Sequence, residues 1–201
     1  MDAEGRVGVQ SLTDGAGAVI RLGKTGSVMT ALANSPYEYI VREGNVWSAS
    51  NQAAQAVSVA LATTYTGFCL SNPLGSVVDL ILLQVSWAVT VAPAGIASLH
   101  LIGGFSATTN VTHTAPITTL TNNHFNQGTP IAKVDSQATI PTPVYLTHLS
   151  SGNTAAALPA AGTNIYYAEG QWVLPPGAFI AIGALTAATG LFSMTWEERS
   201  S

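Results

Sequence analysis

Apolar residues alternate with polar or small residues in several short runs, and many of these runs end at glycine, proline or asparagine. Alternation with a period of two predicts β-strands that bury one face. The longest run is Val77–Val91, whose second half places three valines and a tryptophan on one face and small or polar residues on the other. Pro93-Ala94-Gly95 and a second run, Ala97–Ile102, follow directly. Two such runs joined by a short turn predict a β-hairpin.

Shorter runs of the same kind predict further strands along the chain. They are Tyr37–Arg42, Ala56–Leu61, Phe68–Leu70, Thr142–Leu149, Ala178–Ile182 and Leu191–Trp196. The clearest of the predicted turns is Pro175-Pro176-Gly177, because proline fixes φ and glycine accepts a positive φ. Residues 104–140 and 150–162 are rich in small and polar residues and predict long loops, and only Asn51–Ala56 has modest helical propensity. This spacing of short strands predicts an all-β fold, a β-sandwich or jelly roll, over residues 36–201.

Residues 1–35 differ from the rest of the chain. Six glycines recur there at short intervals between short apolar pieces, and Asn34-Ser35-Pro36 closes the region with a turn signal. The region holds too little bulky apolar material for a core of its own. It therefore predicts an extended N-terminal arm, with short strands joined by turns as the alternative.

Two segments raise the question of a membrane. The start, Met1-Asp2-Ala3-Glu4, is acidic and is not typical of a signal peptide. Residues 77–92 are apolar, but Asp79 and several polar residues interrupt them and Pro93 follows. The uninterrupted apolar stretch is too short for a membrane helix, and its β-branched residues favour a buried strand. We expect no membrane partner.

Charged residues are scarce. They make up 8% of the chain, against about a quarter in ordinary soluble proteins. Between Glu43 and Lys133 the only formal charge is Asp79. Small neutral side chains are inexpensive to desolvate, so this composition predicts contact with other protein, as in a homo-oligomer or an assembly subunit. A monomer with a neutral polar surface is the alternative.

The few basic residues are scattered. The net charge is −4, and the six Lys and Arg residues lie singly between Arg6 and Arg199. Nucleic-acid binding needs clustered basic residues. We expect no nucleic-acid partner.

No candidate catalytic or ligand-binding residue in the sequence has the partners that its chemistry needs. Leu22-Gly23-Lys24-Thr25 lacks the preceding glycine spacing of a phosphate-binding loop. Cys69 lies in an apolar run, which predicts a buried thiol without a neighbouring base. Asp79 has no visible carboxylate partner and is expected to bond backbone groups near a turn. We expect no enzyme activity, no catalytic or cofactor-binding residue and no cofactor.

The four histidines are His100, His113, His124 and His148. No two have the short spacing of a local metal site. His113 and His124 share a loop-rich stretch where a metal or pH-sensing role is the alternative to ordinary polar contacts, and His100 belongs to the polar face of its strand. We expect no metal site.

Aromatic residues leave a binding alternative open. Tyr37, Tyr39, Trp47, Trp172 and Trp196 could form a sugar-binding surface. On strands such residues more often lie in the core or at a subunit contact. The aromatics of the long loops, Phe105 and Phe125, are few.

Several turn and strand segments resemble structural proteins of tailed bacteriophages. The segments are Glu43–Ala54, Leu70–Ser76 with the strand Val77–Val91, Trp172–Gly177 and Met194–Glu198. The resemblance covers most of residues 20–198 and transfers no catalytic residue. It implies a virion component, a capsid decoration (cement) protein or the base of a head fibre.

The resemblance also sets expectations for partners. Decoration proteins commonly occupy threefold positions, so we expect a homotrimer that binds the major capsid protein or other virion proteins. We expect synthesis in the host cytoplasm and a final location on the phage particle. A receptor- or glycan-binding module of a tail or fibre is the alternative.

Overall fold

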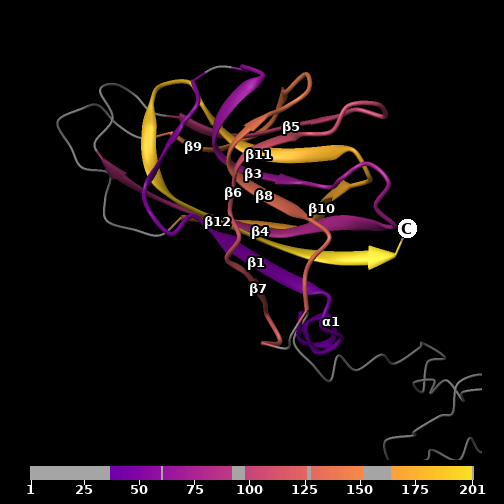
Figure 1. The fold of residues 1–201 in the computed structure, drawn as a ribbon. Helices are drawn as coiled ribbons and strands as arrows, with labels where there is room; N and C mark the ends of the chain where they lie inside the picture. Colours follow the sequence, from indigo (N-terminus) through magenta and orange to yellow (C-terminus); the bar gives the residue numbers. More distant parts are fainter. Residues whose placement is uncertain (1–36, 60, 92–97, 126–127, 152–163, 201) are drawn as a thin grey trace, which may run out of the picture. The chain divides into compact units, whose positions relative to one another are not determined.

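The computed structural model describes residues 37–59, 61–91, 98–125, 128–151 and 164–200. Both β-sheets lie within residues 40–201. Figure 1 shows these sheets as two packed layers of antiparallel strands. The all-β sandwich predicted from the alternation is confirmed. The predicted arm, residues 1–35, lies outside the described residues.

Each sheet has six strands. The first sheet has the order β10 (Asn164–Leu174), β4 (Val78–Val91), β12 (Ala188–Ser200), β1 (Val46–Ser50) and β7 (Leu120–Asn122), with β2 (Gln55–Val57) also paired to β12. The second sheet has the order β6 (Thr112–Pro116), β8 (Lys133–Thr139), β3 (Thr64–Ser71), β11 (Ala178–Ala184), β5 (Ser98–Phe105) and β9 (Val144–Ser151). Every strand pair within the sheets is antiparallel.

Eight of the strands have jelly-roll topology. In chain order these eight strands are β1, β3, β4, β5, β9, β10, β11 and β12. The first sheet places the sixth of them beside the third, the third beside the eighth and the eighth beside the first. The second sheet has the second, seventh, fourth and fifth in that order. This is the double-sheet arrangement of a jelly roll, in which distant segments of the chain lie side by side.

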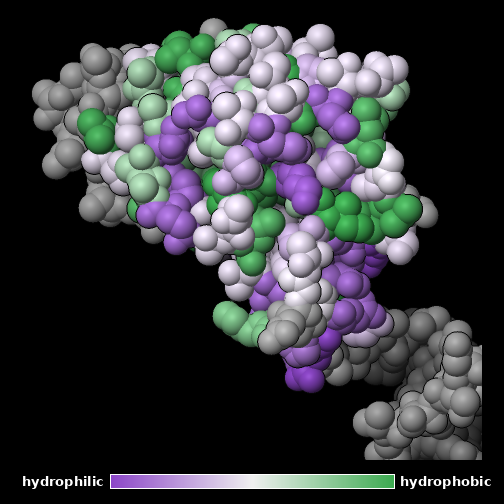
Figure 2. All heavy atoms as spheres, in the orientation of Figure 1, coloured by the Kyte–Doolittle hydropathy of each residue, from purple (hydrophilic) through white to green (hydrophobic). Residues whose placement is uncertain are grey.

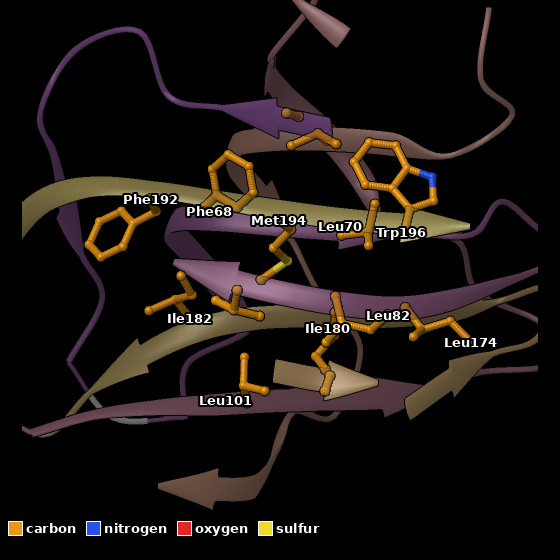
Figure 3. Close-up of a cluster of buried hydrophobic side chains, with 14 of the residues drawn as sticks. Phe68, Leu70, Leu82, Leu101, Leu174, Ile180, Ile182, Phe192, Met194 and Trp196 are labelled. Carbon is orange, nitrogen blue, oxygen red and sulfur yellow. The ribbon is translucent and has the colours of Figure 1, made fainter. Parts of the chain in front are cut away.

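The space between the sheets is filled by large apolar side chains. Figure 3 shows residues of both layers pointing toward one another, among them Trp196 and Met194 from the first sheet and Phe68 and Ile180 from the second. Trp196 and Met194 are fully buried. Successive residues of a strand face opposite sides, so the alternation seen in the sequence supplies these inward-facing residues.

The second sheet also buries side chains on its outer face. Cys69, Phe179 and Ile102 belong to a separate buried cluster, although their neighbours Phe68, Ile180 and Leu101 lie in the main core. Because neighbouring strand residues point to opposite faces, this cluster lies on the side away from the first sheet.

A buried tyrosine fixes a bulge on that outer face. The Tyr65 hydroxyl donates to the Ile182 carbonyl at 2.6 Å and accepts the Phe68 N–H at 2.7 Å. The pairing of β3 with β8 shifts register between Thr66 and Cys69, at the same place. Burial raises the pKa of Tyr65, and the nearby Cys69 raises it further. The phenol is therefore neutral, and its hydroxyl satisfies the buried backbone groups of Ile182 and Phe68 at the bulge.

The predicted hairpin between Val77–Val91 and Ala97–Ile102 is wrong. β4 pairs with β10 and β12, whereas β5 pairs with β9 and β11 in the other sheet. The two strands therefore lie in different sheets. Alternation predicts which face of a strand is buried, and it does not say which strand lies beside it.

Two other local predictions are wrong. Residues Glu38–Arg42 form a short helix, α1, where a strand was expected. Gly44 ends it with a positive φ of 79° and donates its N–H to the Val41 carbonyl at 2.9 Å, a helix C-cap. Residues 104–140, expected as loop, contain β6, β7 and β8.

The remaining strand and turn predictions have mixed outcomes. Asn51–Ala56 is not helical, and Val59 and Leu61 are exposed beyond the short β2. The long strand over residues 77–91, the strand over residues 142–149 and the two C-terminal strands are confirmed within a few residues. The predicted turn at Gly177 is confirmed by its φ of 88°.

Candidate functional site

Exposed large hydrophobic residues lie on the strands at one border of each sheet. β10 is the last strand of the first sheet and β9 the last of the second. Six large hydrophobic residues on β5, β9 and β10 are exposed, and we refer to them as the apolar edge. They are Phe105, Val144, Tyr145, Ile165, Tyr167 and Val173.

A pocket of about 260 Å³ opens at this edge. Residues of β5, β9, β10 and β11 line it, so it lies where the two sheets meet. They are Gly104, Phe105, Val144, Leu146, Trp172, Val173, Leu174, Pro175, Ala178, Phe179 and Ile180. Small-molecule sites usually measure roughly 300–1,000 Å³ and carry a few polar groups. This pocket is smaller and has no titratable lining residue, so it suits an inserted apolar side chain better than a substrate.

The edge strands β9 and β10 carry irregularities that disfavour pairing with a strand of another molecule. Within the described residues, no strand pairs with the outer side of β9 or β10. β10 is broken between Tyr167 and Trp172, where Glu169 and Gly170 have positive φ values of 47° and 83°. Bulges also interrupt the pairing of β9. Bulges discourage edge-to-edge pairing, so contact here is expected through side chains.

The surface of the second sheet is almost free of charge. Lys133 and Asp135 are the only charged residues in its six strands, and Asp135 is fully buried. Figure 2 shows one face of the molecule, on which hydrophobic, intermediate and hydrophilic residues are interspersed. A sheet surface with so few charged residues is inexpensive to desolvate.

The buried carboxylate of Asp135 contacts the imidazole of His113, which is exposed. The His113 Nδ1 atom lies 2.7 Å from Asp135 Oδ2, which joins β6 to β8. The other oxygen, Oδ1, is buried with no hydrogen-bond partner among the described residues. Burial raises the pKa of Asp135, while the hydrogen bond and charge of His113, and then Lys133, lower it in part.

A histidine–aspartate pair supplies two of the three members of a nucleophilic triad, and among the described residues no nucleophile completes it. Cys69 pairs with Asp135 across β3 and β8, but its thiol is fully buried. Burial raises the pKa of Cys69 first, and the charge of Asp135 raises it further. A neutral, inaccessible thiol is not a nucleophile. The pair therefore serves to fix β6 to the sheet.

A second pair joins His100 of β5 and His148 of β9. Their Nδ1 atoms lie 3.3 Å apart and their ring centroids 4.8 Å apart. His100 also contacts Ser98 Oγ through Nε2 at 3.0 Å and the ring of Tyr145 edge-on at 5.1 Å. Burial and then the neighbouring His148 lower the pKa of His100.

The other candidates lie apart from these pairs. Asp79 lies at the start of β4 opposite Arg199 of β12, and His124 is exposed in the turn after β7. In the described ranges, no hydrogen bond or ion pair links Asp79 or His124 to the other histidines, and no group of three His, Cys, Asp or Glu residues could hold a metal ion. Lys24 lies outside the described residues.

The candidate sugar-binding aromatics do not form one surface. Trp47 and Trp196 are buried in the core, and Trp172 packs against it from β10. Tyr39 is exposed on α1. Sequence reasoning missed the exposed residues of the apolar edge, because their exposure depends on which strands end the sheets.

Comparisons with known proteins identify no relative of this chain. No protein-family model, curated protein or solved structure matches this chain. Among the described residues, no helix is long and apolar enough to cross a membrane.

Proposed function

We propose that this chain is a structural protein of a tailed-bacteriophage virion, a capsid decoration (cement) protein that works through protein contacts. One observation carries the proposal. The jelly roll combines an apolar edge and its pocket with a second sheet whose strands hold only one charge that is not buried, Lys133. The resemblance of the turn and strand segments to phage structural proteins supports the same role.

The physical basis is the low cost of desolvation. An interface gains free energy when apolar area leaves water, and it loses free energy when charges are stripped of water without a partner. The apolar edge offers apolar area, and Glu169 is the one charged residue within its three strands, β5, β9 and β10. The pocket beside Phe105, Val144 and Val173 matches the arrangement in which a few buried anchor residues supply most of the affinity.

We propose that copies of the chain meet through the apolar edge to form a homotrimer. Strand addition is disfavoured by the bulges in β9 and β10. A side chain from one copy would instead fill the pocket of the next, and repetition around a threefold axis closes the ring. The trimer would then bind the major capsid protein at repeated positions, so that weak contacts add up over the shell.

The proposal is tested on the particle. Purified chain is added to heads of the encoding phage that were assembled without it, and bound protein is measured after sedimentation. We expect saturable binding at a fixed ratio to the shell protein, and density at threefold positions in images of the particle. Heads that bind none of the chain would contradict the proposal.

The alternative is a receptor- or glycan-binding module of a tail or fibre. The described aromatic residues whose exposed rings would support stacking on sugars are Tyr39, Phe105, Phe125, Tyr145 and Tyr167. Binding of the isolated chain to defined glycans on an array, lost on Tyr→Ala substitution, would favour this alternative. The burial of Trp47 and Trp196 weighs against it.

A further inference from the structure

Two imidazoles face one another across neighbouring strands on the outer face of the second sheet. His100 on β5 lies opposite His148 on β9 in the strand register. Their Nδ1 atoms are 3.3 Å apart. His100 is half-buried and His148 is exposed, so the pair is open to solvent on one side.

Bulges in β9 bring the surrounding side chains to one face. Tyr145 and His148 are three residues apart and would point to opposite faces of a regular strand. The register shifts between Leu101 and Ile102, so that Tyr145 lies opposite Ile102 while His148 lies opposite His100. Both rings therefore contact His100. Bulges that re-aim side chains in this way are common beside functional sites.

Ser98 orients the ring of His100. Its hydroxyl lies 3.0 Å from Nε2, the nitrogen on the far side of the ring from His148. When Nε2–H donates to this hydroxyl, the lone pair of Nδ1 is free. Histidines that bind metals are usually fixed by such a hydrogen bond on the other nitrogen.

We propose that His100 and His148 bind a divalent transition-metal ion of the zinc class through their Nδ1 atoms. Two nitrogens at roughly 2.0–2.1 Å from a tetrahedral ion are about 3.3 Å apart, which is the separation observed. Imidazole nitrogen suits Zn²⁺, Ni²⁺ and Cu²⁺. Within the described part of the chain no third His, Cys, Asp or Glu joins the pair, so water completes the coordination in the isolated protein.

The surroundings favour the neutral form that a metal requires. Metal ligands must be deprotonated. Burial and the neighbouring imidazole lower the pKa of His100. Without a metal the two rings would share one N–H···N hydrogen bond, and that arrangement is the competing explanation of the short distance.

Calorimetric titration of the untagged full-length chain with ZnCl₂ at neutral pH separates the two explanations. We expect one Zn²⁺ per chain in the wild type. Removing one of two ligands in His148→Ala should weaken binding by roughly tenfold or more, and Ser98→Ala should weaken it in the same direction. His124→Ala is the matched control, since His124 is an exposed histidine outside the pair, and it should leave binding unchanged.

A second readout uses the folded state. A bound ion stabilises the protein by mass action, so added Zn²⁺ should raise the Tm of the wild type and of His124→Ala but leave that of His148→Ala unchanged. The proposal is overturned if the wild type binds no Zn²⁺. It is equally overturned if His148→Ala and His100→Ala bind as tightly as the wild type.

Discussion

Replacing Phe105 by serine tests the apolar edge as a contact between copies. Phe105 lines the pocket and is 56% exposed. A buried aromatic side chain removes about 200 Å² from water, so the exposed part corresponds to about 110 Å². At about 25 cal/mol per Å², covering this area contributes about 2.8 kcal/mol per interface. Because about 1.4 kcal/mol is a tenfold change in affinity, Phe105→Ser should weaken each contact roughly a hundredfold.

Sedimentation equilibrium over a range of protein concentrations measures this change. Phe125→Ser is the matched control, because Phe125 is 86% exposed in the turn after β7 and lies outside the apolar edge. We expect Phe105→Ser to dissociate at concentrations where the wild type and Phe125→Ser stay associated. Val144→Ser, in the same pocket, should act in the same direction as Phe105→Ser. An unchanged association constant for both pocket variants, with unchanged circular dichroism, would refute the reasoning.

Three further predictions concern stability. Tyr65→Phe strands the buried Phe68 N–H and should lower the free energy of unfolding by about 1–3 kcal/mol in urea titrations, whereas Tyr145→Phe, at an exposed ring, should change it little. Gly177→Ala places a Cβ against the Ser106 carbonyl at a φ of 88°. The control Gly75→Ala has a φ of 79° and no atom within 4 Å of the added Cβ, and it should lower the free energy of unfolding by about 1 kcal/mol. Gly177→Ala should lower it by well over that amount, and equal losses of stability would contradict the geometry. Burial raises the pKa of Asp135, so its contribution to stability is greatest below the ordinary aspartate pKa and declines as pH rises from about 4 through the folded pKa. The stability of the wild type relative to Asp135→Asn should therefore fall over that range, and a rise would show that the His113 contact outweighs burial.

The layers and the core follow from the sequence because they depend on local alternation. β4 and β12 carry long runs in which alternate residues are buried, and such runs are visible without any knowledge of partners. β6 was missed because four of its five residues are exposed, which leaves no buried face to detect. The short helix α1 was missed because its residues, EYIVR, include the aromatic and β-branched side chains that are typical of strands.

The candidate sites depend on which strands are neighbours. The alternation of apolar and polar residues does not carry that information. His100 and His148 are 48 positions apart and meet only because β5 pairs with β9. His113 meets Asp135 because β6 pairs with β8 inside a region expected as loop. Phe105 and Val173 line one pocket because their strands lie in different sheets that end on the same side.

The mass of the full-length chain in solution, measured by light scattering after size exclusion, tests the central claim most directly. The account predicts a stable particle of about 62 kDa, three times the 20.6 kDa of one chain. A single species of 20.6 kDa that persists at high protein concentration would contradict the account of a homotrimer held together through the apolar edge.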